Sequence, residues 1–148
     1  MKRLTTLTAA LGGLAVVLSL TAKPVLAPGS AIDDIRMCAV EQQTDRCPTD
    51  NPVFERAAEN ITINVRSAGL NVGDEVRFTW YRLDDSEFFS TYLGSVYESI
   101  GASNLEDGTA VVWSRFPEGQ DVLPGNYEVL VHTPGEARPV IKNFKVLD

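Results

Sequence analysis

Apolar and polar residues alternate along most of the chain after its N-terminal segment, with a repeat of two. Ile61, Ile63 and Val65 alternate with polar side chains, and segment 76–81 repeats the pattern around Trp80. A repeat of two is typical of a strand with one face in a core. Strands are therefore predicted at 35–40, 61–66, 76–81, 109–116, 127–131 and 140–147, with one or two short strands or an irregular crossover at 88–100.

Turn-forming pairs such as Asp107-Gly108 and Pro134-Gly135 separate these segments, and no window shows a sustained helical repeat. About seven strands at this spacing predict an all-β domain of two facing sheets. The pattern leaves open which face of 109–116 is buried, because Trp113 on one face competes with Val112 on the other.

The N-terminal segment differs from the rest. Two basic residues follow the initial methionine and precede an apolar stretch at 4–20, which Thr, Gly and Ser interrupt. The stretch is too short and too mixed for a membrane-spanning helix. This order predicts a cleavable signal peptide over 1–27, with cleavage after Ala31 as the alternative. We therefore expect an exported, periplasmic or secreted protein, with a single domain at 28–148 and no membrane span after processing.

Removal of the signal peptide would leave a strongly acidic protein. Three of the 13 Lys and Arg residues lie within 1–27, so 10 basic residues would remain against 20 acidic ones, a formal charge of −10. Binding of phosphate backbones depends on clustered Lys and Arg. The charge therefore predicts that nucleic acid is not a partner.

The two cysteines, Cys38 and Cys47, have eight residues between them. Exported chains meet an oxidising environment, so we predict a disulfide between them. A redox-active pair would normally have the spacing C-x-x-C, and a zinc site would need two further ligands. We expect the bridge to be structural and to fasten an N-terminal loop.

Three stretches resemble immunoglobulin-like and fibronectin type III-like β-sandwich domains of bacterial exported proteins. They are the strand that carries Trp80, the run PGNYEVLV at 124–131 and the run FKV at 144–146. The resemblance covers roughly 61–147. It implies an immunoglobulin-like sandwich and specifies a fold far better than an activity.

The resemblance also implies roles for core residues. Trp80 would pack between the sheets, and Tyr127, two residues before the buried Val129, would tie a corner of the fold with its hydroxyl. The inter-sheet cysteine pair of antibody domains is missing, since Ile63 and Val129 occupy those positions. This departure argues against a close antibody relative.

Little in the sequence favours catalysis. The single histidine, His132, lies on a strand whose other face carries Tyr127 and Val129, so it is expected to face solvent. The sequence contains no G-x-S-x-G elbow, P-loop or dinucleotide-binding glycine run. We predict no catalytic residue and no cofactor, and hence that the protein is not an enzyme.

Asp84, Asp85 and Glu87 form an acidic cluster after the Trp80 strand. Carboxylate oxygens are ligands that calcium prefers, but the spacing fits no EF-hand. A solvated acidic turn is the favoured interpretation, and no metal site is predicted.

Aromatic residues on the middle strands are the candidates for a binding surface: Tyr81, Tyr92, Tyr97 and Trp113. An exposed strip of rings would suit sugar stacking or a protein partner. The alternative is that these rings complete the core or cover an edge strand.

The favoured function is a non-catalytic interaction module that binds another envelope or extracellular protein. The first alternative is a domain that binds a carbohydrate or small ligand through the exposed aromatics. An enzyme of unknown type is the remaining alternative, and no motif supports it.

Overall fold

The computed structural model describes residues 31–40, 46–84 and 89–148. The predicted signal peptide at 1–27 lies outside the described residues. Within them the chain forms nine strands and one short 3-10 helix, η1 (Ala102–Asn104). The strands are β1 (Ala31–Ala39), β2 (Val53–Phe54), β3 (Ile61–Ala68), β4 (Glu75–Leu83), β5 (Ser90–Ser99), β6 (Leu105–Glu106), β7 (Thr109–Arg115), β8 (Gly125–His132) and β9 (Val140–Val146).

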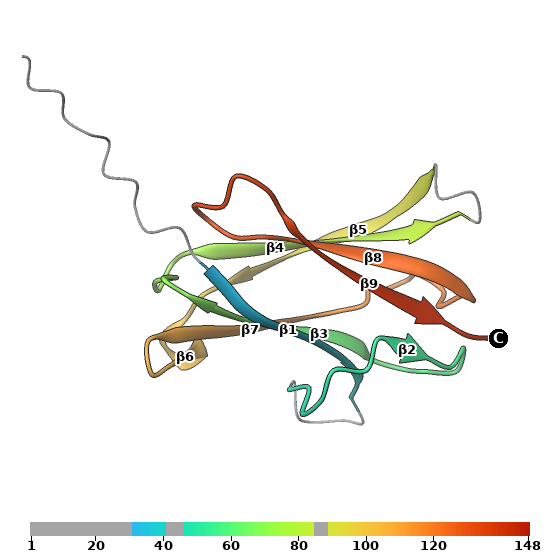
Figure 1. Ribbon diagram of the computed structural model, residues 1–148, viewed down its shortest axis with the longest axis horizontal. Helices are drawn as coiled ribbons and strands as arrows, with labels where there is room; N and C mark the ends of the chain where they lie inside the picture. The colour runs from blue at the N-terminus through green and yellow to red at the C-terminus, as the bar shows by residue number, and fades with distance from the viewer. Residues whose placement is uncertain (1–30, 41–45, 85–88) are drawn as a thin grey trace, which may run out of the picture.

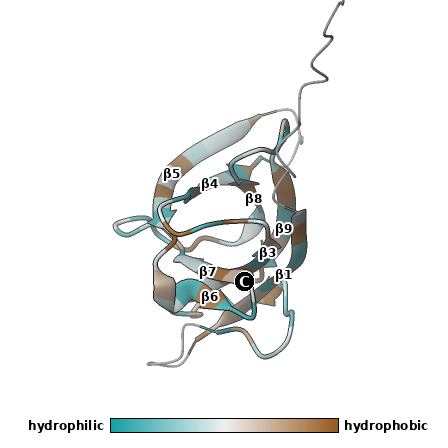
Figure 2. Cartoon of the chain, turned by 90° about the vertical axis from the view of Figure 1, so that its left-hand side faces the viewer, coloured by the Kyte–Doolittle hydropathy of each residue, from teal (hydrophilic) through white to brown (hydrophobic). Residues whose placement is uncertain are grey.

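The strands form two sheets that lie face to face (Figures 1 and 2). The four-stranded sheet has the order β1-β3-β7-β6, and the five-stranded sheet has the order β2-β9-β8-β4-β5. All paired strands are antiparallel except β2, which runs parallel to β9. The prediction of an all-β protein with two sheets is confirmed. The described strands exceed the predicted seven because β2 and β6, of two residues each, are too short to show a periodic pattern.

Aromatic rings fill the space between the sheets. Trp80 is 0% exposed and meets Phe116 and Phe144 edge to face, with ring centroids 5.7 and 5.9 Å apart. Tyr127 stacks on Phe144 at 4.8 Å, and Val129 beside it on β8 is fully buried. This core follows from the repeat of two, because alternate residues of β4 and β8 point to the same side.

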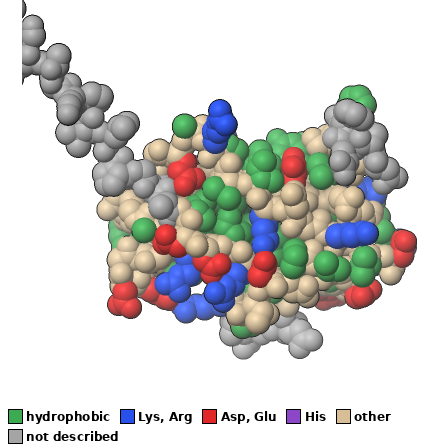
Figure 3. All heavy atoms as spheres, viewed as in Figure 1, with side chains coloured by type: hydrophobic (Ala, Val, Ile, Leu, Met, Phe, Trp, Pro, Cys, Tyr) green, Lys and Arg blue, Asp and Glu red, His purple; other side chains and the backbone are tan. Residues whose placement is uncertain are grey.

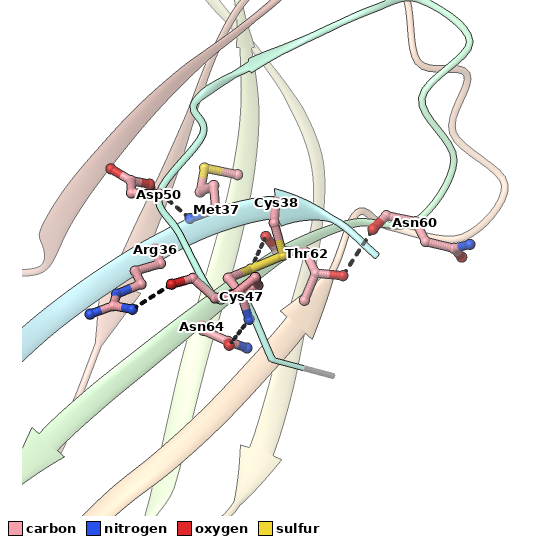
Figure 4. Close-up of a disulfide and its surroundings, with 9 residues drawn as sticks. Arg36, Met37, Cys38, Cys47, Asp50, Asn60, Thr62 and Asn64 are labelled. Carbon is pink, nitrogen blue, oxygen red and sulfur yellow. Dashed lines mark hydrogen bonds between the residues drawn. A yellow bond between two sulfur atoms is a disulfide. The ribbon is translucent and has the colours of Figure 1, made fainter. Parts of the chain in front are cut away.

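The outer face of β3 differs from the sequence-based expectation of one buried face. Thr62 and Asn64, expected at the surface, are buried along with Ile63. The segment that carries Cys47 covers them, and the Cys47 amide donates a 2.5 Å hydrogen bond to the Asn64 side chain (Figure 4). Strand β3 is therefore covered on both faces at Thr62 and Asn64, whereas Arg66 further along the outer face is exposed.

The predicted disulfide between Cys38 and Cys47 is confirmed, and it attaches this covering segment to β1 (Figure 4). Beyond the bridge, the Asp50 carboxylate accepts a hydrogen bond from the Met37 amide at 2.9 Å and pairs with Lys142 of β9. Burial would raise the pKa of Asp50. The hydrogen bonds from Lys142 and Met37 outweigh it, so the pKa lies below its usual value.

The sequence leaves two questions open: the structure of segment 88–100 and which face of segment 109–116 is buried. Within segment 88–100, residues 90–99 form one strand, β5, which is an edge of the five-stranded sheet. In β7, Ala110, Val112 and Ser114 face the core, so Trp113 lies on the outer face. No helix among the described residues is long and apolar enough to cross a membrane.

Candidate functional site

The predicted aromatic surface is divided between the two sheets. Tyr81, Tyr92 and Tyr97 lie on the outer face of the five-stranded sheet, where Tyr81 and Tyr92 are cross-strand partners. Trp113 lies on the outer face of the four-stranded sheet, beside Asn64 in register, with the Arg115 guanidinium 5.2 Å from its ring centroid. The four rings therefore do not form one continuous strip.

The tyrosines also do not make a flat platform. The rings of Tyr81 and Tyr92 meet edge to face, 5.8 Å apart and inclined at 64°. The Tyr92 hydroxyl donates a hydrogen bond to the Ser95 hydroxyl, and Tyr97 is the cross-strand partner of Arg77. Sugar stacking needs an open ring face, so this geometry gives no support to a carbohydrate platform at the pair.

His132 faces outward from β8, as expected, and is half-buried. Its cross-strand partner is Arg77 of β4. Burial lowers the pKa of His132, and the positive charge of Arg77 lowers it further. Both causes favour the neutral form of the imidazole.

The acidic cluster lies mostly outside the described residues, which include Asp84 but neither Asp85 nor Glu87. Asp84 is bonded to Phe89: its amide donates to the Phe89 carbonyl at 3.0 Å, and its carboxylate accepts from the Phe89 amide at 3.4 Å. Among the described residues no group of three His, Cys, Asp or Glu side chains is placed to hold a metal.

An open hollow of about 650 Å³ lies on the five-stranded sheet, at the ends of β4, β8 and β9. Ligand clefts usually have volumes of about 300–1,000 Å³ and combine an apolar lining with a few polar groups. The apolar side is formed by Pro52, Leu83 and Phe89, and the polar side by Ser90, Asn126, Glu128, Asn143 and Lys145.

The polar residues are outward neighbours on two paired strands. Asn126 pairs with Lys145 and Glu128 with Asn143 across β8 and β9. Because Tyr127 and Phe144 point into the core, their chain neighbours point away from it. Four hydrogen-bonding side chains thus share one small area of the sheet.

Glu128 and Lys145 carry opposite charges and line the same hollow, yet they make no ion pair with each other. Neither side chain has an ion pair or hydrogen bond to any described residue. Their charged groups are consequently available to a ligand.

Phe89 supplies the most exposed apolar surface of the hollow, with 74% of its area open to solvent. The Phe89 carbonyl accepts a hydrogen bond from the Asp84 amide, and the Phe89 amide donates to the Asp84 carboxylate, which holds the Phe89 backbone just before β5. Phe89 thus lines the hollow together with the polar residues of β8 and β9.

The sequence pattern does not single out the polar residues of this hollow as a site. The sequence does predict that the Asn126 and Glu128 side chains point outward, because these residues flank the predicted core residue Tyr127. The sequence does not predict that they lie close to Lys145 and Phe89, because that proximity depends on the order in which β9, β8, β4 and β5 pair.

No protein-family model matches the chain, and no curated protein matches it. Among solved structures, the chain is similar to the alkylpurine DNA glycosylase AlkC of Pseudomonas fluorescens, bound to DNA that contains an abasic site analogue. The TM-score is 0.42 and the sequence identity 12%, over 80% of this chain and 30% of the glycosylase chain. This chain thus spans less than a third of that protein's length.

This comparison corrects two predictions. The similar structure is a DNA glycosylase bound to DNA, which does not fit the predicted protein-binding module, so that prediction is withdrawn. The exclusion of nucleic acid as a partner is withdrawn for the same reason. At this TM-score the likeness carries no argument for what the present chain itself binds or catalyses.

Proposed function

We propose that the chain is an exported, immunoglobulin-like sandwich that binds a small zwitterion with an apolar side chain, such as a free amino acid. The binding site is the hollow at the ends of β4, β8 and β9. The observation that carries the proposal is the pair of unpartnered opposite charges, Glu128 and Lys145, beside an apolar wall.

The strand order supports the immunoglobulin-like assignment. In that fold the strands A, B, E and D form one sheet, and G, F and C the other. Here β1-β3-β7-β6 and β9-β8-β4 follow these two orders, with β5 added beside β4. The Tyr127 hydroxyl bonds to the Leu123 backbone, as the tyrosine of such a corner does.

Two features support export. The Cys38–Cys47 disulfide suits an oxidising compartment. The basic start and apolar stretch within 1–27 have the order of a signal peptide.

The ligand class follows from the charges of the hollow. An ammonium group pairs with the Glu128 carboxylate, and a carboxylate pairs with the Lys145 ammonium. The amides of Asn126 and Asn143 can donate and accept further hydrogen bonds. An apolar side chain would then lie along Phe89 and Leu83, where it loses contact with water.

Isothermal titration calorimetry of the purified chain with L-phenylalanine and L-leucine tests the proposal. We expect saturable binding that Glu128→Gln and Lys145→Gln each weaken by roughly tenfold, since a hydrogen bond to a charged group contributes about 1.5–3 kcal/mol. Glu118→Gln and Arg138→Gln are matched controls, because both side chains are exposed, neither lines the hollow, and the charge changes are the same.

The neutral analogue N-acetyl-phenylalaninamide separates charge recognition from simple apolar contact. It carries the same ring but neither charge, so we expect no saturable binding. Equal affinity for the analogue, or unchanged affinity in both Glu128→Gln and Lys145→Gln, would contradict the proposal.

A further inference from the structure

A second, smaller hollow lies on the outer face of the four-stranded sheet, on the opposite side of the sandwich. Its volume is about 120 Å³, and its charged lining consists of Arg36, Arg46, Arg66, Asp34 and Glu106. Three positive charges against two negative ones leave a local excess of one positive charge. This contrasts with the formal charge of −10 over residues 28–148. In the face drawn in Figure 3, Lys and Arg side chains gather next to Asp and Glu on the side where Figure 1 places β1.

Two of the three arginines are held in place by partners. Arg36 pairs with Asp34 at 2.7 Å and donates to the carbonyl of Pro48, which directly follows Cys47, at 2.9 Å (Figure 4). Arg46 pairs with the Glu106 carboxylate. Both guanidinium groups are thereby oriented before any ligand arrives.

Arg66 is different. It is the cross-strand partner of Asp34, but the Asp34 carboxylate pairs with Arg36 of its own strand. No ion pair or hydrogen bond joins the Arg66 side chain to a described residue. Its five donors are free to bind a ligand.

We propose that this hollow binds one small oxyanion, of the phosphate or carboxylate type, with the Arg66 guanidinium as its principal partner. A planar guanidinium matches the paired oxygens of such an anion and donates two parallel hydrogen bonds. Arg36 and Arg46 line the hollow from fixed positions, and Asp34 and Glu106 balance their charges, so the excess positive charge is that of Arg66. The volume of about 120 Å³ suits a single anionic group, since clefts for larger ligands begin at about 300 Å³.

NMR titration of the purified, ¹⁵N-labelled chain tests this site, with inorganic phosphate and acetate as separate probes and chloride used to keep the ionic strength constant. We expect saturable shifts of the Cys47, Arg66 and Val111 amides with at least one oxyanion. Response to phosphate alone, acetate alone or both identifies which type of group the hollow accepts. Absence of saturable shifts with either probe would overturn the proposal.

Substitutions separate a specific site from general charge attraction. Arg66→Gln should weaken binding of the oxyanion roughly tenfold or more. The affinity of Arg66→Lys should lie between those of Arg66→Gln and the unmodified chain, because lysine keeps the charge but lacks the paired donors. Arg138→Gln removes the same charge from an exposed loop, so its affinity should match that of the unmodified chain. Equal weakening by Arg66→Gln and Arg138→Gln would overturn the proposal.

Discussion

The hydroxyl of Tyr127 and the backbone of Leu123 are joined by two hydrogen bonds. The Leu123 amide donates to the hydroxyl at 3.1 Å, and the hydroxyl donates to the Leu123 carbonyl. Burial raises the pKa of Tyr127, so the hydroxyl stays protonated at neutral pH and keeps donating. The contact fastens the loop before β8 to the core.

Tyr127→Phe should lower the free energy of unfolding by about 1–3 kcal/mol, because the Leu123 amide and carbonyl lose a buried partner. The phenyl ring should keep its stacking on Phe144, so the fold should survive. Chemical denaturation measures the change. Tyr97→Phe is the control, since that side chain is 55% exposed and its removal of a hydroxyl should leave stability unchanged.

Trp80→Ala should cost about 3–5 kcal/mol, enough to unfold a domain of ordinary stability. The indole lies between both sheets and contacts two further rings. Thermal melting followed by circular dichroism checks the prediction. Trp113→Ala should cost clearly less, because Trp113 lies on an outer face, and equal losses would contradict the core assignment.

Replacement of both Cys38 and Cys47 by serine should lower stability by about 2–3 kcal/mol on the chain-entropy model, because the bridge closes a short loop. The loss should appear in the denaturation midpoint without a change in secondary structure. Reduction of the unmodified chain should produce the same shift. A midpoint that neither treatment moves would contradict a stabilising role of the bridge.

Gly125→Ala should be destabilising by about 1–3 kcal/mol, through a strained backbone conformation. Gly125 has φ of 145°, and an added Cβ would lie 3.3 Å from the Arg82 Nε. The Arg82 guanidinium cannot withdraw freely, because it donates to the Pro124 carbonyl at 2.9 Å. Gly101→Ala is a suitable control, since its φ lies outside the left-handed region, and denaturant melts of the two variants should differ.

The Asp50 carboxylate should make the free energy of unfolding depend on pH in the acidic range. Its pKa in the folded protein lies below the usual value, so its contribution is fully present above the unfolded pKa of about 3.9 and is lost as pH falls toward the folded pKa. Asp50→Asn should remove this dependence and flatten the stability curve below about pH 4. Denaturation midpoints from pH 2 to 7 test it, and parallel curves for the two proteins would contradict the prediction.

The sequence predicted most of the long strands because burial on one face imposes a repeat of two, which β4 and β8 show clearly. It did not predict β2, whose two residues are too few for any pattern. It also missed the burial of Thr62 and Asn64. Their polar side chains indicate an exposed face, and only the loop held by the disulfide covers them.

The candidate sites were beyond sequence reasoning for a related reason. The aromatic residues singled out from the pattern lie on two opposite faces, because Trp113 belongs to a strand of the other sheet. Conversely, Glu128 and Lys145 lie 17 positions apart in the chain and line the same hollow only because β8 pairs with β9.

The sequence by itself determined the all-β character, the alternation of inner and outer residues and the cysteines that pair. These properties depend on local geometry, in which each side chain's direction is set by its neighbours in the chain. The tertiary structure alone decided which strands lie side by side, and hence which outward charges share a hollow. That choice depends on how two whole sheets bury their apolar faces together, which no short stretch of residues encodes.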